Sequence, residues 1–154
     1  MQTKTKLTID IQCASLAIEK SLALIASSAL LRKWVKAATQ YSGLITLRFV
    51  NQVEGKKLNF AFRNKDKPTN VLTFPYELTK TSLVADIVIC LPVLKKEAKE
   101  QNKPLKEHLA HLVIHGCLHA QGHDHEVEKD AKKMENLEIR LLKDLGFPNP
   151  YLLK

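Results

Sequence analysis

Hydrophobic and polar positions follow three successive patterns in the first third of the chain. Apolar residues alternate with polar ones over 7–13 and again over 44–50, which is the period of a strand with one buried face. Between these stretches, residues 16–41 repeat their apolar positions at helical spacing, and the pair Ser42-Gly43 follows as a stop signal. The pattern predicts one long helix flanked by two strands.

The next segment fits two periods at once. Over 53–63, Leu58, Phe60 and Phe62 match the two-residue period of a strand, while Leu58 and Phe62 also match a helix. Both structures therefore stay open for this segment, which Pro68 ends.

Two further strands are predicted in the middle of the chain, over 70–74 and 83–91. The second is nearly continuous in apolar residues, as a central strand is. Pro75 and Pro92 are expected to bound these strands, because proline cannot donate a hydrogen bond to a ladder.

Two helices are predicted in the last third of the chain. Pro104 suits a helix start, and apolar positions recur after it at helical spacing. The buried stripe of this helix is expected to contain Leu105, Leu109, Leu112, Val113 and Leu118. A final helix is predicted over about 126–145, where Gly146 and Pro148 supply stop signals.

These elements predict a single α+β domain over residues 1–154, in which helices cover a mixed, mostly four-stranded sheet. With 45% hydrophobic residues the chain can bury a sizeable core. No apolar run approaches the roughly 18 residues of a membrane span, and the N-terminus is polar rather than signal-like. We expect a cytoplasmic protein with no membrane partner, whose Cys13, Cys90 and Cys117 stay reduced because they are odd in number and far apart.

Positive charge is concentrated in the first part of the chain. Residues 1–67 hold 12 Lys and Arg against 4 Asp and Glu, whereas the remaining 87 residues hold 12 of each. The densest basic cluster contains a single acid, Asp66, and consists of Lys56, Lys57, Arg63, Lys65 and Lys67. Such a cluster favours a polyanionic partner through counterion release, although a solvated basic surface is an equal alternative.

All six histidines lie between His108 and His125, which indicates a metal site. His115 and His119 are one helical turn apart, so both imidazoles face the same side. Gly122 allows the chain to turn sharply, so that His125 can return toward the same ion. Three nitrogen ligands leave a fourth position on Zn²⁺ for water, as in catalytic zinc sites.

Gly116 separates this pattern from the common zinc peptidases. Their zinc helix places a glutamate directly after the first histidine, where it acts as the general base. Glycine in that position disfavours peptide hydrolysis and costs the helix roughly 1 kcal/mol against alanine. We expect that Gly116 lets a substrate or a neighbouring strand approach the helix backbone.

The remaining histidines have simpler interpretations. His108, His111 and His123 are expected to be partly buried side chains with hydrogen-bond partners, and the first two could instead support the ligand imidazoles. Asp124 could orient a ligand or cap the following helix. Cys117 lies across the helix from the predicted ligands and is expected in the core.

Two separated motifs resemble one known family. The first is the string His115-Gly116-Cys117-Leu118-His119-Ala120-Gln121-Gly122-His123-Asp124-His125. The second comprises Leu58-Asn59, Arg63 and Lys65-Asp66-Lys67-Pro68-Thr69-Asn70-Val71-Leu72-Thr73-Phe74-Pro75. Asp86-Ile87 and Leu145-Gly146-Phe147 agree as well, and the likeness extends from about Leu44 to Tyr151. In order and spacing these residues resemble the bacterial YbeY proteins, zinc-dependent endoribonucleases also called rRNA maturation factors.

The resemblance implies a zincin-like α+β fold and a single Zn²⁺ held by His115, His119 and His125. It also implies cleavage of single-stranded RNA during ribosomal RNA processing, including 16S rRNA 3′-end maturation and ribosome quality control. The implied partners are ribosomal RNA and the small ribosomal subunit with its associated proteins. Ni²⁺ can occupy the same ligands in preparations.

Departures from the family pattern leave every predicted ligand in place. Ala120-Gln121 stands where an apolar pair is usual, His123 where tyrosine is common, and Ala85 where glycine usually precedes Asp86. We interpret these differences as variation in packing.

Arg63 matches the family's functionally important arginine. A metal ion held in part by His115 can polarise a phosphate oxygen or supply hydroxide, while an arginine clamps the phosphate. Lys65 and Lys67 are expected to help bind the substrate. The alternative for Arg63 is an ion pair with Asp66 or Glu77.

The identity of the nucleophile and two other functions stay open. Attack by metal-bound hydroxide and attack by the RNA's own 2′-hydroxyl are both compatible with these residues. A metallohydrolase of peptides or small molecules and a non-catalytic, zinc-stabilised ribosome-assembly factor are the alternative functions.

Overall fold

The computed structural model describes residues 6–63, 70–123 and 127–152, with a four-stranded sheet at its centre. The strands are β1 (Leu7–Cys13), β2 (Ser42–Val50), β3 (Val71–Leu78) and β4 (Ser82–Cys90). Their order is β1-β2-β4-β3, in which the first three neighbours run parallel and β3 pairs antiparallel with β4 at the edge. The predicted mixed α+β sheet is confirmed, including the central place of the apolar strand β4.

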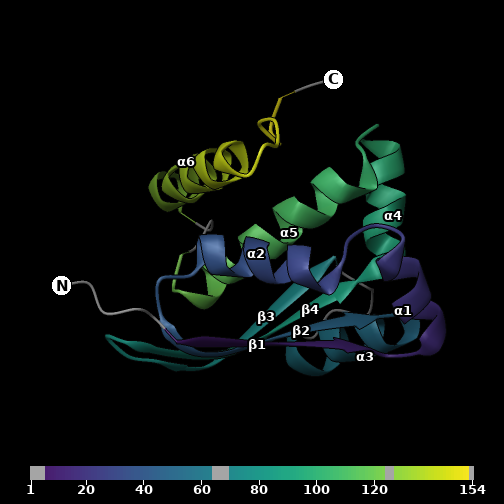
Figure 1. The fold of residues 1–154 in the computed structure, drawn as a ribbon, viewed down its shortest axis with the longest axis horizontal. Helices are drawn as coiled ribbons and strands as arrows, with labels where there is room; N and C mark the ends of the chain where they lie inside the picture. The colour runs from purple at the N-terminus through teal and green to yellow at the C-terminus, as the bar shows by residue number, and fades with distance from the viewer. Residues whose placement is uncertain (1–5, 64–69, 124–126, 153–154) are drawn as a thin grey trace.

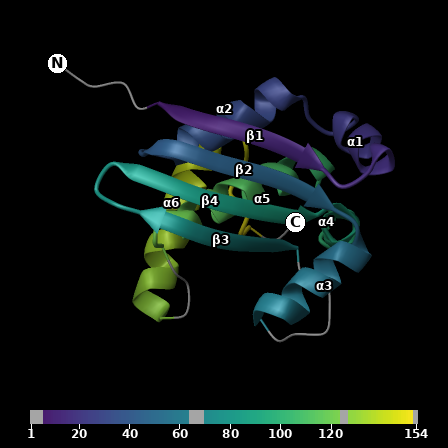
Figure 2. The same cartoon turned by 90° about the horizontal axis from the view of Figure 1, so that it is seen from below.

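Six helices accompany the sheet in the described ranges. They are α1 (Leu16–Ala23), α2 (Ser28–Ala38), α3 (Gln52–Arg63), α4 (Leu91–Glu100), α5 (Leu105–Ala120) and α6 (Glu128–Asp144). Figure 1 shows α2 and α5 over the same face of the sheet, with α6 beyond them. Seen from below in Figure 2, the strands lie in front of these helices. Since α5 contacts α2, α4, α6, β3 and β4, it is the most enclosed helix.

The predicted long helix over 16–41 is wrong, because the chain forms two helices there. The break follows Ala23, and α2 starts after Ser27, whose side-chain oxygen accepts the N–H of Leu30 at 3.1 Å. A serine cap satisfies backbone N–H groups that a continuous helix would have used internally. Leu24 lies at the break and is 90% exposed, so an apolar residue that fits the helical spacing of the sequence is not buried in the structure.

Ser42 and Gly43 begin β2 instead of ending a helix. Gly43 has a φ of 128°, and a Cβ on it would lie 2.0 Å from the carbonyl oxygen of Leu83, its partner on β4. The glycine is therefore required by strand pairing at this position.

Pro75 and Pro92 were expected to lie at the ends of strands, but the structure places both of them inside elements. Pro75 lies inside β3, next to a register shift between Pro75 and Glu77, which an edge strand tolerates. Pro92 lies in the first turn of α4, a helix that the sequence pattern did not predict. The ambiguous segment before them forms the helix α3.

The core lies between the sheet and the α2–α5 layer. Its largest fully buried side chains include Trp34 on α2, Phe49 on β2 and Ile114 on α5. The ring of Phe147, after α6, meets Trp34 edge-on with centroids 5.7 Å apart, which joins the C-terminal segment to this layer. No helix in the described ranges is long and apolar enough to cross a membrane.

Candidate metal centre

His115 and His119 lie on one face of α5, as predicted from their spacing. Their ring centroids are 4.6 Å apart and the ring planes are inclined by 76°. The opposite side of the helix is buried, and Cys117 is among its fully buried residues, as expected. Burial raises the pKa of the Cys117 thiol to about 12, so this cysteine stays a neutral core residue.

Glu138 joins the histidine face from the neighbouring helix α6. Its carboxylate is fully buried and accepts hydrogen bonds at both oxygens: Oε1 lies 2.7 Å from Nδ1 of His115, and Oε2 lies 2.6 Å from Nε2 of His111. The hydroxyl of Tyr151 donates to the same Oε2 at 2.5 Å. One carboxylate thus connects α5, α6 and the C-terminal segment.

The ionisation of Glu138 determines which atoms carry protons. Burial by itself would raise the pKa of this carboxyl group, but hydrogen bonds from His111 and His115, together with Tyr151, lower it to about 2. An ionised carboxylate accepts hydrogen bonds only, so His115 must donate from Nδ1. In that tautomer the lone pair of His115 that can bind a metal ion is on Nε2.

Two groups of residues are candidates for holding an ion, and both contain His115. The first is the sequence-predicted set His115, His119 and His125. The second is the group of partly buried His111 and His115 with buried Glu138, whose ligand atoms all lie within 4.8 Å of one another. The second group would take Glu138 as a ligand, whereas the first leaves Glu138 as the hydrogen-bond partner of Nδ1 of His115.

The short distances within the second group favour shared protons. Ligand atoms bound about 2.0–2.1 Å from a tetrahedral zinc ion would lie roughly 3.3 Å apart. The observed separations of 2.6 and 2.7 Å at Glu138 are shorter and are those of charge-assisted hydrogen bonds. The geometry therefore favours Glu138 as a support for His115 over Glu138 as a ligand.

The end of α5 turns as the sequence predicted. Gly122 has a φ of 94° and its N–H donates to the carbonyl of His119, while the N–H of His123 donates to the carbonyl of Leu118. This pair of bonds is a Schellman motif, which reverses the chain directly after the helix. Asp124 and the predicted third ligand, His125, both lie outside the described residues.

Gly116 lets the sheet approach α5. A Cβ on this residue would lie 2.7 Å from Cγ2 of Ile87 on β4 and 3.5 Å from Cγ2 of Val71 on β3. Of the two explanations that the sequence left open, the neighbouring strand is the one observed. The absence of a glutamate at this position has a packing reason in addition to its chemical consequence.

His108 and Glu97 form a second, partly buried polar cluster near the candidate metal centre. Nε2 of His108 lies 3.0 Å from Oε1 of Glu97, and the side-chain amide of Asn70 donates to both carboxylate oxygens at 3.1 and 3.3 Å. Burial would raise the pKa of Glu97, but the hydrogen bonds from His108 and Asn70 lower it overall. His108 and His111 thus have the hydrogen-bond partners expected of them, and His123 is partly buried.

The sequence-predicted basic cluster is only partly described. Lys56 and Lys57 are exposed on α3. Arg63 ends that helix, but its side chain lies outside the described part of the structure, as do Lys65 and Lys67. Their placement relative to the histidines stays a prediction.

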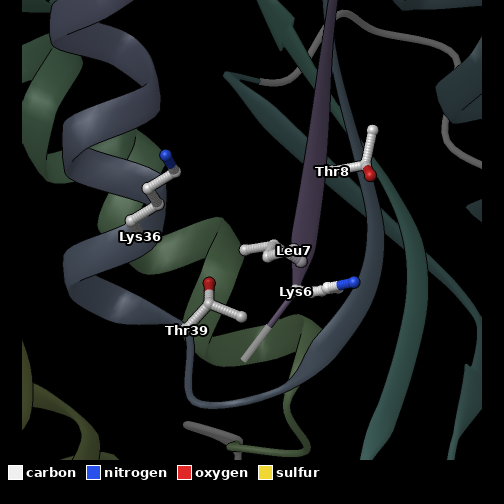
Figure 3. A pocket seen from close by; sticks show the side chains of 5 residues that line it. All are labelled: Lys6, Leu7, Thr8, Lys36 and Thr39. Atoms are coloured by element: carbon white, nitrogen blue, oxygen red, sulfur yellow. The ribbon is translucent and has the colours of Figure 1, made fainter. Parts of the chain in front are cut away.

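Two hollows differ in their relation to this centre. One of about 320 Å³ reaches His115 and is also lined by Asn70, Lys103, His111 and Tyr151. The other has a volume of about 460 Å³ and lies at the edge of the sheet formed by β1, whereas β3 forms the other edge. Figure 3 shows its five lining side chains, among which Lys6 and Lys36 are the only charged ones. Only the first hollow combines space with a candidate metal ligand.

Sequence reasoning missed Glu138 and Tyr151. A signal for Glu138 was present, because the glutamate falls on the buried stripe of α6, four residues from both Met134 and Leu142. A carboxylate in an apolar stripe needs a buried partner. No comparable pattern marks Tyr151, which reaches the site only because the chain folds back after α6.

Comparison with known proteins gives a consistent result over nearly the whole chain. The family model described as Endoribonuclease YbeY matches residues 8–146. A protein of that name from Polynucleobacter asymbioticus is 68% identical over 152 residues, covering 99% of this chain and 98% of the relative. The protein of the same name from a Janthinobacterium species is 51% identical, covering 99% of each chain.

A solved structure has the same fold. The solution structure of TM1509 from Thermotoga maritima matches with a TM-score of 0.57 and 27% identity, covering 90% of this chain and 92% of that one. The fold described above is therefore shared with a solved structure over nearly the whole of both chains.

Proposed function

The chain belongs to the YbeY endoribonuclease family, and we propose that its endoribonuclease activity depends on zinc, acts on single-stranded RNA and serves ribosomal RNA processing. The proposed tasks are 16S rRNA 3′-end maturation and ribosome quality control, with the small ribosomal subunit and its proteins as partners. This follows from the resemblance of the motifs at Arg63 and His115.

The observation that carries the zinc assignment is the hydrogen bond between Nδ1 of His115 and Glu138. With Nδ1 donating to Glu138, Nε2 is the nitrogen of His115 that we propose as the ligand atom, and His119 is the neighbouring imidazole on the same face. The donor set of neutral imidazoles suits Zn²⁺, although Ni²⁺ fits the same donors. We assign the ion to His115, His119 and His125.

Each residue then has a defined role in RNA cleavage. Glu138 keeps the proton of His115 on Nδ1, and the hollow beside His115 provides room next to it for part of the substrate. Zinc, when bound, supplies Lewis-acid polarisation of the phosphodiester. We propose that Arg63 binds the scissile phosphate through both guanidinium nitrogens, and that Lys65 and Lys67 bind neighbouring phosphates.

The test of the function is cleavage of a labelled single-stranded RNA by protein whose metal content has been measured. Cleavage is expected to stop when a chelator removes the metal and to be absent in His119→Ala, while RNA binding remains. Stoichiometric metal without cleavage, together with a loss of stability in His119→Ala, would instead support the assembly factor. Turnover of peptides without turnover of RNA would support the other metallohydrolase.

A matched pair of variants separates the two candidate metal groups. His111 and His119 lie four residues before and after His115 on the same helix, so each can be changed to alanine in an equivalent position. Our assignment predicts that His119→Ala loses the ion and that His111→Ala retains it. The opposite result would transfer the site to His111, His115 and Glu138.

A further inference from the structure

Charges on α6 are separated into different faces, although the helix contains five basic and five acidic residues. At about 100° per residue, all five basic side chains fall within an arc of roughly 100°, and that arc contains no acid. The sixth residue in the arc is Asn136. We call this face the α6 basic stripe; it consists of Lys129, Lys132, Lys133, Arg140 and Lys143.

The α6 basic stripe is open to solvent. All five of its basic residues are exposed, and none forms an ion pair with another described residue. The opposite side of the helix is buried through Met134, Glu138 and Leu142. Figure 1 shows α6 at the outside of the molecule, beyond α5. A helix with no net charge thus presents one positive surface.

We propose that the α6 basic stripe binds the phosphodiester backbone of the RNA substrate. From Lys129 to Lys143 the stripe is about 21 Å long at 1.5 Å per residue, which spans several consecutive phosphates. This inference rests on the proposed function, because it assigns to the same RNA a contact surface outside the metal centre.

The stripe is close to the candidate metal centre across α6. Glu138, on the opposite face of α6, holds His115, so the two surfaces are separated by about the 10–12 Å diameter of one helix. An RNA strand along the stripe would therefore pass within about one helix diameter of the candidate metal centre.

The composition of the stripe favours RNA over an acidic protein. Protein interfaces are anchored by buried aromatic and apolar side chains, and the arc contains none. The shallow hollow along the stripe is lined by Lys129, Lys132, Lys133, Asn136, Leu137 and Arg140. Leu137 lies at its edge and packs partly into the core. Repeated cations without apolar anchors suit sequence-independent contact with phosphates.

The experiment compares two triple variants with the same loss of charge. The test variant is Lys132→Gln, Lys133→Gln and Arg140→Gln on α6. The control is Lys95→Gln, Lys96→Gln and Lys99→Gln, three exposed lysines of α4. Binding of a labelled single-stranded RNA is followed by fluorescence anisotropy at several salt concentrations, in the native background and in His119→Ala. Thermal unfolding and metal content are measured for each protein.

The stripe variant is expected to bind the RNA about 10- to 100-fold more weakly near 0.1 M salt. Its slope of log K against log salt should fall by about 2, at roughly 0.7 per lost phosphate contact on a single strand. The α4 control should keep the native slope, and both variants should keep native metal content. These results together would support the stripe as an RNA surface.

Two outcomes would overturn the inference. If the stripe variant binds RNA with native affinity and salt slope, RNA does not bind this surface, and an acidic protein becomes the alternative partner. Equal losses in both triple variants would mean that only total charge matters. The proposed function is tested separately, because RNA that binds through the stripe without being cleaved would contradict the nuclease assignment and not the surface.

Discussion

Nδ1 of His115 lies 2.7 Å from Oε1 of Glu138, so a side chain of α5 and one of α6 share a proton at the candidate metal centre. The same carboxylate holds His111 and the hydroxyl of Tyr151. The last helix and the C-terminal segment are thereby tied to the orientation of one imidazole. A change of Glu138 should therefore affect metal binding although α6 supplies no proposed ligand.

The first prediction concerns Glu138→Gln, which keeps the shape of the side chain. A glutamine accepts hydrogen bonds only at its amide oxygen, so its two terminal atoms cannot both accept from His115 and His111 as the carboxylate oxygens do. We expect metal affinity to fall about 10- to 100-fold, as it does when a partner of a ligand histidine is lost. Competition with a chromophoric chelator measures this affinity.

Glu135→Gln is the matched control, because Glu135 is an exposed glutamate on the same helix. Its metal affinity should equal that of the native protein. Equal affinities for native protein and Glu138→Gln would contradict the role given to Glu138.

The second prediction concerns Gly116→Ala. The new methyl group would lie 2.7 Å from Cγ2 of Ile87, so the Ile87 side chain, α5 or β4 must shift. Overpacking of this kind costs about 1–3 kcal/mol, against a gain of roughly 1 kcal/mol in helix propensity. Urea unfolding should show a net loss of up to about 2 kcal/mol.

Gly55→Ala provides the comparison, since its Cβ would lie 3.3 Å from the Sγ atom of Cys90 and the required shift is smaller. This variant should lose less stability than Gly116→Ala. If Gly116→Ala were the more stable of the two, close packing against the sheet would not be the reason for that glycine.

The third prediction concerns Arg63. Arg63→Ala should lower RNA cleavage far more than it lowers the free energy of unfolding, because the proposed role is to clamp the phosphate. Arg63→Lys keeps the positive charge but loses the bidentate geometry, so it should restore only part of the activity. Steady-state cleavage and urea unfolding of the same samples give the two quantities. Equal losses in both would remove the clamp assignment.

The fourth prediction concerns pH. Glu97 has a lowered pKa in the folded protein because of His108 and Asn70, so the unfolded state binds more protons as the pH falls. Its contribution to stability is complete above the unfolded pKa, about 4.3, and is lost as the pH falls through the lower folded value. The stability difference between native protein and Glu97→Gln should therefore be largest above about pH 4.3 and shrink in acid.

Glu100→Gln, an exposed position on the same helix, should show no such pH-dependent difference. Unfolding in urea at a series of pH values provides both curves. A constant difference between Glu97→Gln and native protein across this range would mean that the carboxylate charge has no part in the interaction.

Local patterns in the sequence determined the strands β1, β2 and β4, the start of α5 and the common face of His115 and His119, because these depend on periods of two or 3.6 residues. The turn at Gly122 was also predictable from the local sequence, because glycine adopts a positive φ without strain. The division of 16–41 into two helices was not predictable. The apolar residues keep their helical spacing across the break, and the serine that caps α2 does not interrupt that spacing in the sequence.

Relationships between distant segments were decided by the tertiary structure. The net charge of the last 87 residues is zero, which concealed the α6 basic stripe until the helix showed which residues face outward. Gly116 could have faced a substrate or a strand, and only the packing of α5 on β4 selected the strand. The proton on His115 was fixed by a carboxylate 23 residues away, because hydrogen bonds depend on distance in space while sequence patterns record only neighbours along the chain.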